Sequence, residues 1–263
     1  MENYQIEDHD LQPKPSRKSV RVILTIVLLG LFVISLVPRV LFTWAHTYYE
    51  KGEYRTALIF YNVTTWIDPK NPRVYYGRGR TYASLNKPDF ALDDYSKAIN
   101  IDSTFAVAYV GRCNIHNGQE NFDLAITDCT KAIELGTSDV TAYTSRGMAY
   151  LKKNQFALAV SDLTKAIEFT PNRAFLYDLR GRGYMGLKKY ELAIRDFIKA
   201  VKLYTSNTRI AETYCYLGVT YTRINEFPMA ISSLERGVKL DNGNNLEWCR
   251  TALTNAEQGI RTP

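Results

Sequence analysis

The sequence predicts an all-α protein, a solenoid of about six helix–turn–helix repeats with a C-terminal capping helix and an N-terminal transmembrane helix. Two observations predict the solenoid: residue types recur every 34 positions, and apolar residues recur at helical spacing within each repeat. A third observation, an uncharged apolar run near the N-terminus, predicts the membrane helix. A length of 263 residues accommodates one such array and a tail.

The 34-residue period is visible in five independent sets of positions. Each set keeps one residue type through four successive repeats. The sets are Tyr75, Tyr109, Tyr143 and Tyr177; Arg78, Arg112, Arg146 and Arg180; Ala91, Ala125, Ala159 and Ala193; Asp94, Asp128, Asp162 and Asp196; and Ala98, Ala132, Ala166 and Ala200. A fixed period of this length indicates a stacked array in which each repeat is one supersecondary unit.

The segment 140–173 shows how one repeat is expected to fold. Tyr143, Gly147 and Tyr150 recur at i, i+4 and i+7, which is the spacing of one helix face. After the break "KKNQ", a second helical stripe follows, formed by Phe156, Ala159, Val160, Leu163, Ala166 and Ile167. Each repeat is therefore predicted to be two amphipathic helices joined by a tight turn, with small residues where the helices meet.

These positions resemble the tetratricopeptide repeat family, whose 34-residue unit carries aromatic, Leu-Gly, Ala and Pro residues at fixed offsets. The resemblance covers about four-fifths of the chain and implies a right-handed superhelical solenoid. Six repeats are predicted at residues 38–71, 72–105, 106–139, 140–173, 174–207 and 211–244. The departures are Cys113 and His116 at a Gly and a Tyr position, Gly237 at an Ala position, and three extra residues, Thr208 to Ile210, expected to bend the array.

Residues 245–263 are predicted to form a capping helix and a tail. Leu246, Cys249, Leu253 and Ala256 fall on one helical face, which is expected to cover the open side of the sixth repeat. Arrays of this kind need a polar-backed cap at each end to stay soluble.

The apolar run from Val22 to Val37 contains sixteen residues and no charge. It predicts a transmembrane signal anchor over residues 20–42, after a cytoplasmic disordered tail over residues 1–19. A buried core helix and a cleaved signal peptide are the alternatives, but "SLVPRVLF" lacks the small residues of a cleavage site. Trp44 follows at the depth where interfacial aromatic residues lie.

Lysine and arginine bias predicts the orientation of the anchor. The basic residues before the run are Lys14, Arg17, Lys18 and Arg21, and those soon after it are Arg39, Lys51 and Arg55. The small excess before the run places the N-terminus in the cytoplasm and the repeats outside it, in a periplasmic or lumenal compartment.

The family resemblance implies a concave groove lined by first helices, which is expected to bind a protein or peptide partner. The implied groove residues are Phe42, His46, Tyr76, Arg80, Asn114, Asn117, Met148, Asp178 and Arg182, with Tyr49, Arg73, Val110, Thr144 and Phe175 beside them. Arg80, Asn114 and Arg182 would hold a carboxylate or the carbonyls of an extended peptide. The alternative for any of these residues is a solvated surface without a ligand. The residues of the family's clamp for chaperone tails are absent from the first repeat, so that ligand is not predicted.

The repeated arginines and aspartates have two interpretations. One is a structural ladder of ion pairs within or between repeats, and the other is a charged strip that binds a ligand. Repetition in every middle repeat favours the ladder, because a binding site rarely needs the same residue in each copy.

The four cysteines, Cys113, Cys129, Cys215 and Cys249, form no Cys-x-x-Cys motif and no zinc pattern. They are expected to be small buried apolar residues. A Cys113–Cys129 disulfide is the less favoured alternative, because facing helix axes usually lie about 8–10 Å apart.

No catalytic, nucleotide-binding or metal motif is present, so we expect no enzyme activity, cofactor or metal ion. The net charge of +6 is spread along the chain, which argues against nucleic-acid binding. The leading hypothesis is a membrane-anchored scaffold that docks partner proteins, with a role in envelope assembly or export by analogy. The alternatives are a self-associating or bracing subunit of a membrane complex and a cytosol-facing import or chaperone co-receptor.

Overall fold

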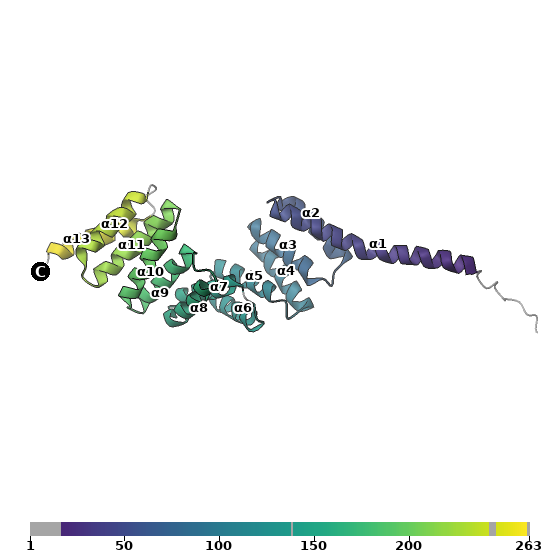
Figure 1. Cartoon of the computed structure of the whole chain (residues 1–263), viewed down its shortest axis with the longest axis horizontal. Coiled ribbons are helices and arrows are strands. Elements are labelled where there is room, and N and C mark those ends of the chain that lie inside the picture. The colour runs from purple at the N-terminus through teal and green to yellow at the C-terminus, as the bar shows by residue number, and fades with distance from the viewer. Residues whose placement is uncertain (1–16, 138, 242–245, 262–263) are drawn as a thin grey trace, which may run out of the picture. The chain divides into compact units, whose positions relative to one another are not determined.

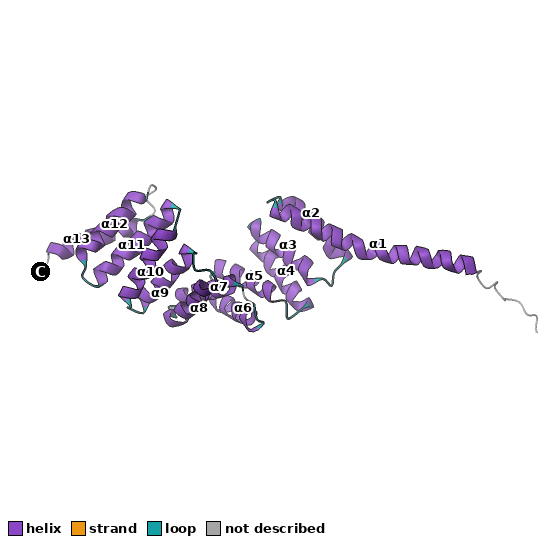
Figure 2. Ribbon diagram, in the orientation of Figure 1, coloured by secondary structure: helices purple, strands orange, loops and turns teal. Residues whose placement is uncertain are grey.

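The computed structural model describes residues 17–137, 139–241 and 246–261. These residues form thirteen helices, and no strand occurs among them (Figures 1 and 2). The chain divides into two units, residues 1–70 and residues 71–263, which are described separately. Most of the expected cytoplasmic tail, residues 1–16, lies outside the described residues.

The first unit is a helical hairpin of α1 (Arg17–Glu50) and α2 (Tyr54–Ile67). Helix α1 continues through Pro38, so the apolar run and the first helix of the first repeat form one helix. Within the described residues no helix is both long and apolar enough to cross a membrane. The side chains at positions 22–24 and 26–35, which hold most of the predicted anchor, lie outside that description.

The second unit stacks five hairpins and one further helix. The hairpins are α3 (Pro72–Ser84) with α4 (Pro88–Ile101), α5 (Ala106–Gly118) with α6 (Phe122–Glu134), α7 (Val140–Lys152) with α8 (Phe156–Phe169), α9 (Ala174–Gly186) with α10 (Tyr190–Leu203), and α11 (Asn207–Arg223) with α12 (Phe227–Leu240). Helix α13 (Glu247–Arg261) packs on α12. Side-chain caps set two helix starts: the Asn71 side chain caps α3 before Pro72, and the Asp139 side chain caps α7.

The three extra residues, Thr208 to Ile210, lie inside α11. Helix α11 has 17 residues, whereas the first helices of the other repeats in this unit have 13. The insertion therefore adds about one helical turn to the start of the sixth repeat.

Small residues let the two helices of a repeat approach closely. A Cβ added to Gly147 would lie 3.0 Å from Leu163 Cγ, and one added to Gly181 would lie 2.8 Å from a ring carbon of Phe197. In both pairs the bulky residue follows the glycine by sixteen positions, and its side chain fills the space that a Cβ would need.

In the third repeat the same two positions hold Cys113 and Cys129, which form a disulfide with a Cα–Cα distance of 5.6 Å. The expectation of unpaired cysteines was therefore wrong. It relied on the usual separation of helix axes, but these positions lie at the closest crossing, where the Cα–Cα distance fits a disulfide.

A second disulfide, Cys215–Cys249, joins α11 to the capping helix α13 with a Cα–Cα distance of 5.5 Å. Helical spacing in the sequence places Cys249 on the apolar face of the cap but predicts no partner for it. Cys215 and Cys249 pack with Ala256 in one buried cluster. Gly237 makes room for this bond, because a Cβ there would lie 2.6 Å from Cys215 Sγ and 3.0 Å from the Ala211 carbonyl oxygen.

Each arginine of the repeat donates two hydrogen bonds to the aspartate sixteen residues later. In the fourth repeat Arg146 Nε and Nη2 donate to the two carboxylate oxygens of Asp162 at 2.7 and 2.8 Å. The same paired geometry occurs in Arg78–Asp94, Arg112–Asp128 and Arg180–Asp196. The aspartates are buried, so the pairs lie between the helices of one repeat rather than on an open binding surface.

The remaining arginine nitrogen reaches the preceding repeat. Arg146 Nη1 donates to Thr130 Oγ1 at 3.0 Å. Arg112 and Arg180 make the equivalent bonds to Ser96 and Thr164. The hydrogen bond to the aspartate raises the pKa of each of these three arginines. The ladder therefore connects neighbouring repeats as well as the two helices of one repeat.

Replacing Asp162 with Asn tests the ladder. We expect Asp162→Asn to lower the free energy of unfolding by about 3 kcal/mol, because it leaves a half-buried guanidinium without its counter-charge. Lys165→Ala, which removes an exposed pair with Glu168 on the same helix, is the matched control and should leave the urea midpoint unchanged. Equal midpoint shifts for the two variants would contradict the structural role of the ladder.

The two disulfides are tested by chemical labelling and by stability. We expect all four cysteines to resist thiol labelling in denaturant until a reductant is added. Because each bond closes a loop of the unfolded chain, reduction should cost about 3–4 kcal/mol of stability per bond. Labelling of four thiols in the unreduced, denatured protein would show that the bonds are absent.

A basic aromatic cavity as the candidate functional site

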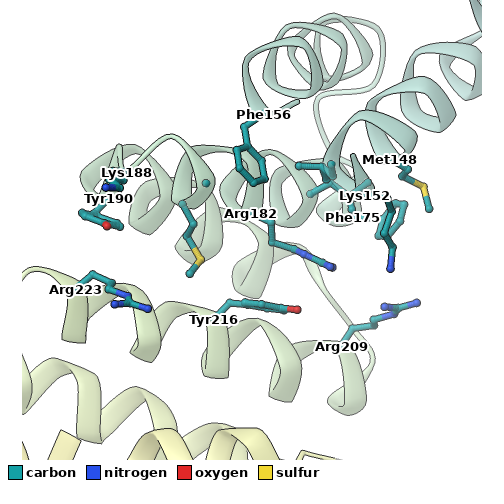
Figure 3. A pocket seen from close by; sticks show the side chains of 14 residues that line it. Met148, Lys152, Phe156, Phe175, Arg182, Lys188, Tyr190, Arg209, Tyr216 and Arg223 are labelled. Atoms are coloured by element: carbon teal, nitrogen blue, oxygen red, sulfur yellow. The ribbon is translucent and has the colours of Figure 1, made fainter. Parts of the chain in front are cut away.

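A cavity of about 850 Å³ opens among the first helices of the last three repeats. Figure 3 shows side chains from α7, α9 and α11 pointing into one shared space. The lining residues are Met148, Leu151, Lys152, Phe156, Phe175, Leu179, Arg182, Met185, Gly186, Lys188, Tyr190, Arg209, Tyr216 and Arg223. Its volume lies in the range of ordinary ligand pockets.

The lining combines positive charge with aromatic rings. Five lining residues are cationic and none is acidic: Lys152, Arg182, Lys188, Arg209 and Arg223. The Arg182 guanidinium lies 4.9 Å from the ring centroid of Tyr216, and that of Arg209 lies 5.8 Å from the ring of Phe175. Such stacking orients the guanidinium planes and leaves their edges available for carboxylates.

Arg209 reaches the cavity because of the insertion in the sixth repeat. It belongs to the extra turn at the start of α11, and its Nη1 lies 3.3 Å from Glu212 Oε2. From the sequence alone, these extra residues are expected only to bend the array. In the structure they supply one of the five cationic residues of the cavity.

Asp178 lies behind the cavity and is 4 % exposed. Its Oδ1 accepts a hydrogen bond from Thr213 Oγ1 at 3.2 Å, and its Oδ2 lies 3.9 Å from Arg182 Nη1. Burial raises the pKa of Asp178 to about 6, although the positive charge of Arg182 opposes the shift. This carboxylate connects α9 to α11 and stands next to a cationic residue of the cavity.

Of the groove residues implied by the family resemblance, Met148 and Arg182 line the cavity, together with Phe175 beside them. Asp178 is buried, so it does not face a ligand directly. The other predicted groove residues do not line the cavity, and three of them make contacts with neighbouring side chains or backbone. Asn114 Oδ1 accepts from Ser145 Oγ, Asn117 Nδ2 donates to the Ser145 carbonyl oxygen, and Arg80 lies over the ring of Tyr76.

Phe42 and His46 belong to α1 in the first unit. Phe42 packs edge-on against Tyr61, and the exposed His46 lies 3.8 Å from Glu50. These two residues therefore contact their own hairpin.

The sequence did not indicate the other eleven lining residues, among them Lys152, Phe156, Lys188, Tyr190, Arg209, Tyr216 and Arg223. The positions of the sixth repeat that correspond to the predicted groove residues of the other repeats hold Cys215 and Val219, because the three-residue insertion shifts the register. The clustering of basic and aromatic residues around the insertion is the sequence feature that could have indicated this cavity.

Family comparison decides the class of protein. Models of the tetratricopeptide repeat match residues 40–71, 72–105, 140–173 and 176–207, which together make up half of the chain. The chain belongs to the tetratricopeptide repeat family. Proteins of this family bind peptides or other proteins and are typically not enzymes.

Solved structures agree on the fold. PilF of Pseudomonas aeruginosa has a TM-score of 0.70 at 14% identity, over 86% of this chain and 98% of its own. YrrB, a tetratricopeptide repeat protein described as having an unusual peptide-binding site, has a TM-score of 0.65 at 20% identity, over 75% and 97% of the two chains. MamA of Desulfovibrio magneticus has a TM-score of 0.60 at 20% identity, over 66% and 97%. No curated protein matches the sequence.

Asp178→Asn tests the electrostatics behind the cavity. The folded pKa of about 6 lies above the ordinary 3.8, so the stabilising contribution of protonated Asp178 is lost as pH rises through about 6. We expect the variant to lack this loss and to be more stable than the wild type at pH 7.5 by about 1–3 kcal/mol. Unfolding should be compared at pH 4.5 and 7.5, with the exposed Asp123→Asn as control. A variant that is less stable at pH 7.5 would show that attraction to Arg182 dominates over burial.

Proposed function

We propose that the protein is a membrane-anchored scaffold that binds an acidic segment of a partner protein outside the cytoplasm. The observation that carries this proposal is the cavity of repeats four to six, with five cationic residues, four aromatic rings and no acidic residue in its lining. The proposal places the binding site in this cavity rather than along the whole groove.

The composition of the cavity defines the ligand that it would accept. Guanidinium groups pair with carboxylates in a bidentate manner, and apolar walls favour aromatic or aliphatic side chains. The walls include Met148, Phe156 and Met185. A segment with several Asp or Glu residues around one or two large apolar residues combines both requirements. The positive field would also steer such a segment to the site.

The sequence supports the anchor. The run from Val22 to Val37 has no charge, and helix α1 passes without interruption from this run into the first repeat. Fixed to a bilayer by this helix, the array would meet membrane-associated partners at a raised effective concentration.

The two disulfides support an oxidising, extracytoplasmic compartment for the repeats. The same location follows from the lysine and arginine bias around the apolar run. Both observations argue against the cytosol-facing co-receptor that the sequence left open.

Peptide binding tests the function. The probes are fluorescein-labelled twelve-residue peptides of Glu, Asp, Phe and Gly, and a control with every acidic residue changed to Ser. We expect fluorescence anisotropy to show binding of the acidic probe only, with an affinity that falls as salt is raised. Arg182→Glu combined with Arg209→Glu should weaken it at least about tenfold, because like charges now oppose the peptide.

The matched control is Lys165→Glu combined with Lys199→Glu, which makes the same charge change on exposed second-helix positions. Equal loss of binding in both double variants would indicate a nonspecific charge effect and contradict a site in the cavity. Tight binding of the Ser-containing probe would contradict the proposed ligand chemistry.

A further inference from the structure

Helix α2 carries an exposed apolar stripe. Ile59, Val63 and Trp66 follow one another at i, i+4 and i+7 and are 63%, 41% and 84% exposed. This spacing places them on one helical face. The opposite face, with Ala57, Tyr61 and Thr64, is the buried one.

The equivalent face of every other second helix is polar. The positions equivalent to Ile59 hold Asp93, Thr127, Ser161, Arg195 and Ser232; those equivalent to Val63 hold Lys97, Lys131, Lys165, Lys199 and Arg236; and those equivalent to Trp66 hold Asn100, Glu134, Glu168, Lys202 and Lys239. All fifteen are exposed. The repeat thus faces water at these positions, and the first repeat alone places large apolar residues there.

A second substitution separates the first repeat from the four middle repeats. Trp44 stands at the position of the ladder arginine and Phe60 at the position of its aspartate. Their rings meet edge-on with centroids 5.6 Å apart, and Trp44 is 52% exposed. The first repeat has therefore replaced an ion pair with an aromatic pair that is half open to its surroundings.

The hairpin geometry locates the stripe relative to the apolar run of α1. The two helices are antiparallel, since Phe42 contacts Tyr61 while Tyr49 contacts Tyr54. One residue towards the N-terminus of α1 corresponds to one residue towards the C-terminus of α2. Trp66 therefore lies at about the same level along the hairpin as Val37. Val37 is the last residue of the uncharged run, and it is itself 38% exposed.

From this register we propose that the face of α2 formed by Ile59, Val63 and Trp66 lies against the lipid bilayer, at the boundary between headgroups and acyl chains. The inference rests on the proposed membrane anchor. Tryptophan is enriched at that boundary because its ring is apolar and its N–H is polar. Exposed Arg39 follows Val37 by two residues, so it lies close to that boundary and can meet lipid phosphates.

This contact would give the first repeat a fixed orientation on the membrane. A single helix alone allows the attached array to rotate about the helix axis. A second apolar face, on the antiparallel partner, removes that rotation because only one side of the hairpin can contact lipid. The first repeat would then be a membrane-bound base rather than a ligand-binding unit.

The test uses the full chain incorporated into phosphatidylcholine and phosphatidylglycerol vesicles, with brominated phosphatidylcholine as quencher. Trp44→Phe with Trp248→Phe leaves Trp66 as the single fluorophore, and Trp44→Phe with Trp66→Phe leaves Trp248 in the capping helix. Flotation of the vesicles reports the anchor, and quenching reports the contact. We expect both proteins to float, with Trp66 quenched about twofold and Trp248 unaffected.

A second variant adds Ile59→Asp and Val63→Lys, the residues of the second repeat, to the Trp66-only protein. It should float and lose the quenching, because a charged face leaves the bilayer. A floating protein with unquenched Trp66 overturns the contact and leaves the anchor intact; light scattering in detergent would then show whether a second copy covers the face. A protein that does not float overturns both.

Discussion

The buried arginine–aspartate pair of each middle repeat is the interaction on which the rest of the structure depends. Each arginine holds the second helix of its own repeat through two hydrogen bonds. In three repeats its third nitrogen also bonds to the repeat before. The pair therefore fixes the angle between helices and the step from one repeat to the next. The separation of the two helices is fixed where they cross most closely. There a glycine faces a bulky side chain, or, in the third repeat, Cys113 is bonded to Cys129.

The repeated residues fix the arrangement of the helices. The features particular to this protein therefore lie at positions that depart from the repeat pattern. The insertion in the sixth repeat lengthens α11 and brings Arg209 to the cavity. The pair Cys215–Cys249 attaches the capping helix covalently, with Gly237 making room for it. The first repeat exchanges its ion pair for Trp44 and Phe60.

Much of the fold could be predicted from the sequence because it depends on residues that recur. The helix pairs and the apolar face of the cap follow from spacing alone. Repetition of the arginines and aspartates favours a ladder of ion pairs, but it does not fix which aspartate each arginine contacts. The disulfides did not follow, because an average separation of helix axes conceals the closest crossing at Cys113 and Cys129. Most of the cavity did not follow either. It combines residues from three repeats across a change of register, and Asp178 faces α11 instead of the groove.

The central claim is that ligand binding belongs to repeats four to six and not to the array as a whole. Hydrogen exchange of the full chain, with and without the acidic phenylalanine-containing probe, tests it most directly because every amide reports separately. We expect slower exchange at the C-terminal end of α7 and along α9 and α11, which carry most of the lining residues, with α3 and α5 unchanged. Protection that centres on α3 and α5, or that is spread evenly over all first helices, would contradict it.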